Sequence, residues 1–396
     1  MIRIVVYSFA TLMDVVLSAA TLECMWWMSD AGARPSAVAA FIPVWAVVYT
    51  IASLAAGHLV TNRNAPWLLI SACAFTAVLS VAFAGADSPP ALYALIALLG
   101  VAAAFFFTPF QVFMKLVDRG RNKGICHSTG TYTFAWSLGY ALGPFIAGYL
   151  WVHGGWKACH LFNAALSAAM AVGAYCLKHH AQDKPGRPEP AADPAGSRDF
   201  DYSAMPDLAW MAWVFSGVGC LASALIRSVF PSSGAAYDIP KPTQGTTLLI
   251  LSATQALVGL AHSRSRTWMY RPLPVLVFGL FGIAALGLFS VARAPETFHI
   301  AAALFGVYSG SFYFYFVFHS LVHPVRAGRY VSINEAVVGI AGLLGPFAGG
   351  HLGDRFGLSS AYFAALALTA AAVAVQSACH WRGHLRLDHE MRERNA

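Results

Sequence analysis

The chain of 396 residues is 58% hydrophobic and only 11% charged. Soluble domains carry about 25% charged residues, so this composition excludes a water-exposed surface and, with it, an ordinary soluble enzyme. The net charge of +7 does not indicate a nucleic-acid-binding protein, because the basic residues are scattered between apolar segments. The seven cysteines form no CxxC pair, which argues against a disulfide framework or a zinc site, and we expect no cofactor.

Twelve apolar segments of about 20 residues follow one another along the chain, each long enough to cross a membrane as a helix. The first contains Asp14 and runs directly into the second, so we interpret it as an uncleaved membrane helix rather than a signal peptide. The sequence therefore predicts an all-α multi-pass membrane protein with helices at 3–27, 36–60, 66–85, 90–114, 125–152, 157–178, 208–230, 244–262, 272–292, 296–318, 330–352 and 358–380.

The polar stretch 179–207 is rich in proline, alanine and charge, and it lacks the apolar residues needed for a core. We interpret it as a flexible cytoplasmic linker that separates a six-helix bundle at 1–178 from a second bundle at 208–381, which a tail at 382–396 follows. The bundles are related by a repeat with an offset of 202 residues. Residues with an identical partner at this offset are Leu142, Gly143, Pro144, Phe145, Gly148, Leu150 and Gly155.

The positive-inside rule gives the expected orientation. With both termini and the linker in the cytoplasm, most of the 25 Lys and Arg residues are cytoplasmic. We therefore expect cytoplasmic termini in a plasma membrane, which is the inner membrane in a bacterium. The exceptions are Arg34, Lys157, Lys241, Arg293 and Arg355 in outer loops, and Arg227 near the outer end of the seventh helix.

The fifth helix carries the spacing G-x8-G-x3-G-P-x2-A-G, formed by Gly130, Gly139, Gly143, Pro144 and Gly148. With the twelve helices, the linker and the half repeat, it resembles the major facilitator superfamily over nearly the whole chain, and it is similar to the signature of the twelve-helix antiporters. The resemblance implies two six-helix bundles related by a pseudo-two-fold axis, alternating access, and export by antiport. A second family motif is altered after the second helix, and its intact-looking copy at 350–357 falls on the outer side.

The same glycines and prolines also have a structural interpretation. Small residues let helix backbones approach closely in lipid, and proline bends a membrane helix. We expect packing and hinge roles for Gly130, Gly139, Gly143, Pro144, Gly148, Gly345, Pro346, Gly349 and Gly350.

The first helix carries a polar stripe at helical spacing, which must avoid lipid and therefore faces a cavity or another helix. Asp14 lies near the middle of this helix, where the charged form of a carboxylate is disfavoured. We interpret it as a candidate proton carrier, with a carboxyl that locks two helices together as the alternative. The stripe is Tyr7, Thr11, Asp14, Ser18 and Thr21, and the equivalent face of the seventh helix carries Trp213, Ser216, Cys220, Ser223 and Arg227.

Three further charged residues lie in apolar segments. Glu335 shares a face of the eleventh helix with small residues, which indicates either proton coupling or a structural hydrogen bond. Arg227 is suited to attracting an anionic group of a substrate or to pairing with an outer acid such as Asp30 or Asp238. Glu23 points away from Asp14, and we expect it to anchor the helix at the outer interface.

Matched aromatic stripes occur on the fourth and tenth helices, which flank the cavity in the family that the chain resembles. An aromatic lining suits a hydrophobic or cationic organic solute, while ordinary packing and lipid contact are the alternative. The stripes are Phe106, Phe110 and Phe113 on the fourth helix and Tyr308, Phe312 and Tyr315 on the tenth.

Histidine pairs at His319 and His323 and at His380 and His384 look similar to the histidine boxes of membrane di-iron enzymes. The larger set of boxes which that chemistry needs is absent, so a histidine-box membrane metalloenzyme is a remote alternative. No nucleotide-binding loop is present, which leaves ATP coupling within this chain unsupported.

These patterns together predict a monomeric secondary active transporter rather than an enzyme. Our first interpretation is proton-coupled export of a small organic solute, with Asp14 and Glu335 as proton carriers. The alternative is proton-coupled or facilitated uptake of a small metabolite, including an anionic one. The expected partners are the solute, protons and the lipid bilayer.

Overall fold

The computed structural model describes residues 2–61, 63–117, 125–182, 205–265, 268–322 and 327–394, and every regular element in these ranges is a helix. Most of the expected linker and His323 lie outside the described residues. The first half of the chain, called the N half here, forms α1 (Ile2–Asp30), α2 (Pro35–Ala39), α3 (Phe41–Leu59), α4 (Ala65–Ala84), α5 (Pro89–Val117) and α6 (Ile125–Gln182).

The second half, called the C half, begins with a short turn of helix α7 (Ala209–Met211) that continues through η1 into α8. Here η1 is a π-helical turn, which locally widens the seventh membrane helix. The remaining elements are η1 (Ala212–Ser216), α8 (Gly217–Ala236), α9 (Lys241–His262), η2 (Trp268–Tyr270), α10 (Pro272–Val291), α11 (Pro295–Leu321), α12 (Ala327–Phe356) and α13 (Leu358–Arg394).

The membrane helices match the twelve expected from the sequence. In the described chain, 11 helices are long and apolar enough to cross a membrane. One of them, α6, contains two crossings, because its helix is interrupted at Gly155. The ends of the helices differ from the predicted ends more than their number does. The second predicted segment is divided into α2 and α3, and α13 continues as a helix to Arg394 through most of the expected tail.

The glycine that divides α6 has an equivalent in the C half. Gly155 has φ 67 and ψ −168, a backbone conformation that only glycine adopts easily. Gly357, at an offset of 202 residues, separates α12 from α13 with φ 84. The repeat seen in the sequence therefore places the same backbone turn at the same point of each half.

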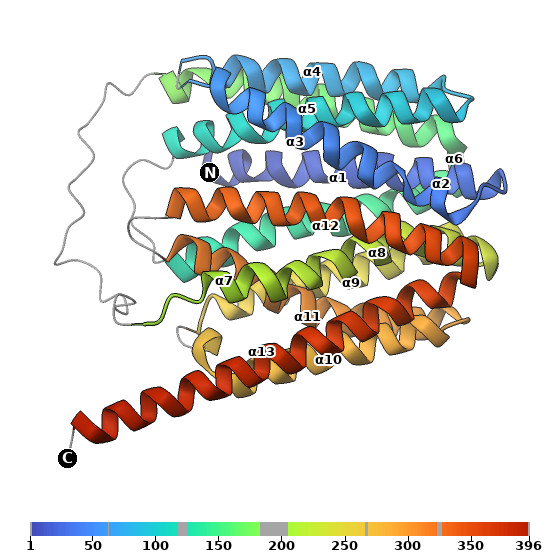
Figure 1. The fold of residues 1–396 in the computed structure, drawn as a ribbon. Helices are drawn as coiled ribbons and strands as arrows, with labels where there is room; N and C mark the ends of the chain where they lie inside the picture. Colours follow the sequence, from blue (N-terminus) through green and yellow to red (C-terminus); the bar gives the residue numbers. More distant parts are fainter. Residues whose placement is uncertain are drawn as a thin grey trace.

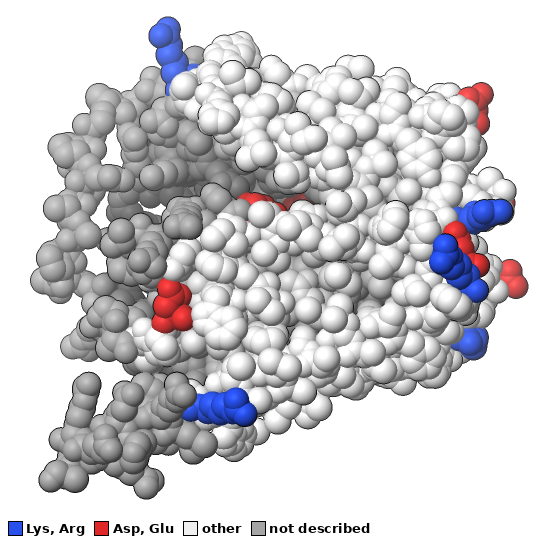
Figure 2. All heavy atoms as spheres, viewed as in Figure 1, with Lys and Arg blue, Asp and Glu red and all other residues white. Residues whose placement is uncertain are grey.

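Both termini lie at one end of the helical bundle in Figure 1, and we call this end the termini side. The opposite end, where α1 ends and α9 begins, is the far side. Figure 2 shows charged atoms gathered at these two ends, with an almost uncharged band between them. Large apolar side chains such as Ile51, Val78 and Val172 are more than half exposed on this band, as expected for a surface in contact with lipid.

Two seams join the halves. Along the first, α6 packs on α9 with glycines at both ends, because a side chain at Gly130, Gly148, Gly245 or Gly259 would overlap the opposite helix. Between them the Gln255 amide donates to the Ser137 hydroxyl over 2.7 Å. Along the second seam, α2 and α3 pack on α12.

The glycine contacts within the halves repeat as well. Gly143 of α6 leaves room only for the backbone and Ser18 of α1, and Gly345 of α12 takes the same place against Leu221 of α8. Pro144 and Pro346, which follow these glycines, lie inside their helices and are buried. Their packing and hinge roles stay a prediction, and the close approaches are what such roles need.

Candidate functional site

The polar stripe of α1 faces α6 at the middle of the N half. A side chain in place of Gly139 would overlap Thr11 and Asp14, so the two helices touch at this point. Asp14 is only 4% exposed, and its carboxylate has no hydrogen bond or ion pair within the described residues. It lies within electrostatic range of Tyr49 on α3 and Tyr140 on α6.

The hydroxyl groups around Asp14 are satisfied by helix backbone. Thr11 donates to the carbonyl of Ala135 on α6 over 2.9 Å. Ser18 donates to the carbonyl of Asp14 over 2.6 Å, and Thr21 donates to that of Leu17 over 2.8 Å. These hydroxyls are therefore not available to the Asp14 carboxylate, whereas Tyr7 is partly exposed at the termini side of the same stripe.

Glu335 comes from α12, on the other side of the space between the halves. Its side chain is exposed, and it lies within electrostatic range of Tyr49 on α3 and Cys220 on α8. Four residues further along α12, Gly339 faces Thr50 of α3. Figure 2 shows a hollow on the termini side of the bundle with acidic atoms inside it.

Arg227 of α8 lies within the membrane region without an acidic partner among the described residues. One guanidinium nitrogen donates to the Ser252 hydroxyl of α9 over 2.7 Å. The guanidinium carbon is 5.1 Å from the centre of the Tyr140 ring, a cation–π arrangement that joins the two halves. The outer acid Asp30 is bonded to Lys241 instead.

These residues form a network between the halves that we call the central cluster. Tyr140 lies within electrostatic range of both Asp14 and Arg227, and Tyr49 lies within range of Asp14 and Glu335. Trp136 packs edge-on against Tyr313 of α11, with ring centres 5.0 Å apart. The central cluster is Asp14, Tyr49, Trp136, Tyr140, Arg227, Ser252, Tyr313 and Glu335.

Sequence reasoning missed five members of this cluster, namely Tyr49, Trp136, Tyr140, Ser252 and Tyr313. Tyr49, Ser252 and Tyr313 are polar side chains in apolar helices. Trp136 and Tyr140 lie four residues apart on α6, so their helical spacing was a signal that the sequence contained. The spacing alone does not show that this part of α6 packs against α1 and lies beside Asp14.

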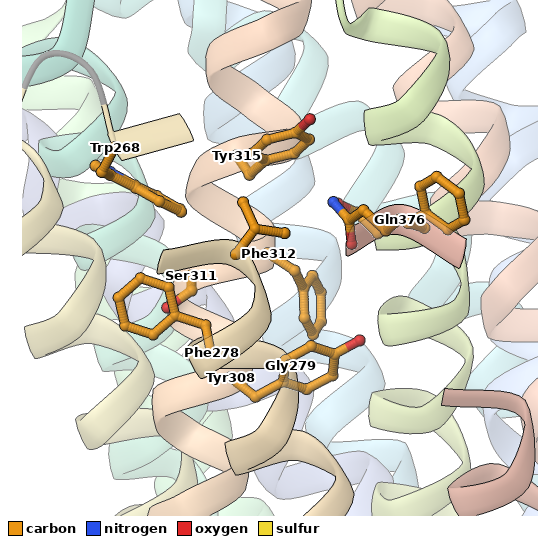
Figure 3. A pocket seen from close by; sticks show the side chains of 11 residues that line it. Trp268, Phe278, Gly279, Tyr308, Ser311, Phe312, Tyr315 and Gln376 are labelled. Atoms are coloured by element: carbon orange, nitrogen blue, oxygen red, sulfur yellow. The ribbon is translucent and has the colours of Figure 1, made fainter. Parts of the chain in front are cut away.

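The expected aromatic linings lie elsewhere. Phe106, Phe110 and Phe113 are buried in the hydrophobic core of the N half. Tyr308, Phe312, Tyr315 and Ser216 surround a small cavity inside the C half, between η1, η2, α10, α11 and α13 (Figure 3). Its volume of about 30 Å³ suits one or two water molecules rather than an organic solute. A substrate-binding role for these residues stays a prediction.

The other polar residues of the seventh helix take part in contacts with neighbouring helices. Trp213 donates from Nε1 to Asn334 of α12 over 2.9 Å. Ser223 is buried and interacts with the hydroxyl of Tyr313. These contacts connect η1 with α12 and α8 with α11.

One histidine of each pair, His319 and His380, is buried inside the C half. His319 is 1% exposed, and its ring contacts Tyr315 at 4.4 Å between ring centres. His380 pairs through Nε2 with the Tyr315 hydroxyl at 3.1 Å. In the described part of the chain, no three His, Cys, Asp or Glu side chains are grouped so as to hold a metal ion.

Glu23 is buried, contrary to the interfacial position expected from the sequence. It is 1% exposed and lies 3.2 Å from Nδ1 of His160, while the Asn163 amide donates to the same carboxylate oxygen over 3.2 Å. Glu23 lies on the side of α1 opposite to Asp14, as expected, but this side packs against His160 and Asn163 in the second part of α6 and not against lipid.

Contacts between the halves close the far side. The Trp26 indole of α1 donates to Gln244 of α9 over 2.7 Å, and both side chains are buried. Leu22 and Trp26 also join the hydrophobic core of the C half. Asp354 accepts a bond from the backbone N–H of Ser36 over 3.1 Å. The hollow seen in Figure 2 lies toward the termini side, so the space between the halves opens there.

Known membrane transporters share this arrangement of helices. The family model described as Major Facilitator Superfamily matches residues 4–325. A bacterial homologue of the human lysosomal transporter Spinster, solved in an inward-facing and occupied conformation, has a TM-score of 0.68 and 13% identity over 96% of each chain. Its inward-facing and unoccupied form gives 0.69 and 12% over the same shares.

A second solved relative is a single-residue mutant of the nucleoside transporter NupG, with a TM-score of 0.63 and 14% identity over 96% of this chain and 99% of that one. At these identities the likeness shows the fold alone. No curated protein matches the sequence.

Proposed function

Because the chain belongs to the major facilitator superfamily, and is therefore a membrane transporter rather than an enzyme, we propose that it is a proton-coupled secondary active transporter of a small organic solute. One observation carries the coupling: Asp14 is buried where α1 meets α6, Glu335 is exposed on α12, and neither has a basic partner among the described residues. A carboxylate in such a place is costly unless it exchanges a proton or binds a charged ligand.

The two carboxylates are arranged so that rocking of the halves changes their surroundings. Asp14 belongs to the N half and Glu335 to the C half, and Tyr49 lies within electrostatic range of both. When the far side opens, α3 and α12 move relative to each other, so Asp14 and Glu335 no longer share Tyr49 as a neighbour. A proton taken up on one side of the membrane is then released on the other.

The termini side is assigned to the cytoplasm of a plasma membrane, because most Lys and Arg residues fall in the loops and tail on that side. With this assignment, the closed far side and the open termini side make the structure an inward-facing state. The Spinster homologue, described as inward-facing, supports the assignment through its similar fold.

Export by antiport is the direction we propose, on the glycine–proline spacing of α6 between Gly130 and Gly148. The close approaches of Gly139 and Gly143 to α1 support this, because they bring Pro144 beside the helix that carries Asp14. Uptake is the other direction open to the same site.

The coupling is tested with the full chain in proteoliposomes, using solutes that raise its melting temperature. Asp14→Asn should abolish accumulation driven by a pH gradient, while exchange of labelled for unlabelled solute continues. Full gradient-driven accumulation by Asp14→Asn across the pH range would refute the proton-carrier role. Direction is read in membrane vesicles, where accumulation only in right-side-out vesicles would assign uptake instead.

A further inference from the structure

The central cluster contains a cation whose charge nothing in the described chain balances. Arg227 makes one hydrogen bond, to Ser252, and one ring contact, to Tyr140. A guanidinium carries five N–H donors, so most of the donors of Arg227 have no acceptor among the described residues. Burying a cation without a counter-charge costs several kcal/mol, and such residues within membranes mark ligand or ion pathways.

The surroundings of Arg227 are accessible from the space between the halves. Its side chain is partly exposed, as are those of Trp136, Tyr140 and Tyr313, whereas Ser252 is buried behind it. Ser252 therefore fixes one edge of the guanidinium, and its carbon lies over the ring of Tyr140, which in turn contacts Trp136. These rings come from both halves, α6 and α11, as expected for a site that both halves enclose.

We propose that the transported solute carries an anionic oxygen group that Arg227 binds, beside an apolar or aromatic body that packs on Trp136, Tyr140 and Tyr313. The inference rests on the proposed transport function and names its substrate class as organic acids. A planar carboxylate accepts two parallel N–H bonds from a guanidinium, which a lysine cannot supply. The position of Arg227 on α8 also lets an anion contact both halves through Tyr140.

The rings of Trp136, Tyr140 and Tyr313 favour organic acids that carry an aromatic ring. The rings of Trp136 and Tyr140 have centres 6.0 Å apart at an interplanar angle of 88°, and Trp136 meets Tyr313 at 84°. Edge-to-face contact is an arrangement that aromatic rings prefer, so a ring of the solute can join this cluster in the same way. Benzoate is therefore a suitable probe, since it combines a carboxylate with one ring.

The test is equilibrium binding to the purified full chain in phosphatidylcholine nanodiscs, read as the rise in melting temperature with added ligand. The probes are benzoate, benzyl alcohol and benzylamine, which share a ring and differ in charge. Benzoate alone should stabilise the protein. Arg227→Gln should weaken benzoate binding at least about 10-fold, because a charge-assisted bond is lost, and Arg227→Lys should weaken it less.

Arg293 supplies the matched control. Its guanidinium also lies over a ring, 4.7 Å from the centre of Tyr237, but on the far-side surface. Arg293→Gln should bind benzoate as the unmodified protein does. If Arg227→Gln does not fold, Ser252→Ala tests the same point, since it frees the guanidinium edge and should weaken benzoate binding several-fold.

Three outcomes would overturn the proposal: equal stabilisation by benzylamine or benzyl alcohol, benzoate binding that survives in Arg227→Gln, or no stabilisation by benzoate. Adding phosphatidylglycerol to the nanodiscs shows whether the natural ligand of Arg227 is a soluble anion or an anionic lipid headgroup. Displacement of benzoate by that lipid in the unmodified protein, with no lipid effect in Arg227→Gln, would assign the site to an anionic lipid. Since no proton gradient is applied, failure of coupling and failure of anion binding remain distinguishable.

Discussion

The bond between Trp26 and Gln244 should decide how strongly the far side stays closed. The indole N–H donates over 2.7 Å, and the Gln244 amide donates in turn to the Ile239 carbonyl over 2.7 Å. Gln244→Met keeps the volume of the side chain but removes the acceptor. The buried indole N–H then has no partner while the far side is closed, whereas water can reach it when the far side is open.

The size of the effect follows from this difference. Leaving a buried donor unpaired costs about 1–3 kcal/mol, which corresponds to a shift of about 5- to 150-fold in the ratio of the two states. The ion pair between Lys241 and Asp30 joins the same two helices but lies at the surface, with Asp30 48% exposed. Exposed pairs contribute about 0.2–1 kcal/mol. Lys241→Gln should therefore shift the ratio only about 5-fold or less.

The assay is a distance distribution between spin labels on the far side. Cysteines in place of Asp87 and Glu296, which are exposed in different halves, carry the labels in a background without other cysteines. Gln244→Met should populate longer distances than Lys241→Gln. A larger shift with Lys241→Gln, or none with Gln244→Met, would show that the buried bond does not hold the far side closed.

Three further predictions concern coupling and packing. Glu335→Gln should lose accumulation driven by a pH gradient and keep solute exchange in proteoliposomes; unchanged accumulation would leave Glu335 without a coupling role. Gly143→Val should destabilise by about 1–3 kcal/mol or more in thermal unfolding because α1 leaves no space there, while Gly57→Val, with open space around it, should not. Gly155→Ala has space but an unfavourable φ, and should cost about 1–3 kcal/mol, against a small effect for Gly85→Ala. Equal melting temperatures for Gly143→Val and Gly57→Val would contradict the packing argument, and equal melting temperatures for Gly155→Ala and Gly85→Ala would contradict the argument from the backbone conformation.

The fold could be predicted from the sequence because a lipid bilayer requires every spanning helix to be apolar and about 20 residues long. Apolar runs of about 20 residues and an offset of 202 residues were enough for the twelve helices and the halves. The helix ends were less accessible. The break at Ala40 between α2 and α3 and the continuation of α13 to Arg394 depend on local backbone geometry, for which apolar content gives no signal.

The candidate site was only partly predictable. Asp14, Glu335 and Arg227 stand out because a charge within an apolar run has few explanations. Aromatic residues give no such contrast: Phe106 is buried in the core and Trp136 lies between the halves, yet both occupy similar apolar helices. The sequence also shows which face of a helix is polar but not which helix covers it, so Glu23 was expected at an interface and is buried against His160.

The seam between α6 and α9 has a consequence for the cost of motion. At Gly130, Gly148, Gly245 and Gly259 one helix meets the other with bare backbone. Glycine has no side-chain rotamers. Rotation of one half against the other about the seam between α6 and α9 therefore changes the side-chain entropy little. The seam can therefore act as the pivot of the molecule, around which the looser contacts of α3 with α12 separate. We expect the halves to part least where their residues are smallest.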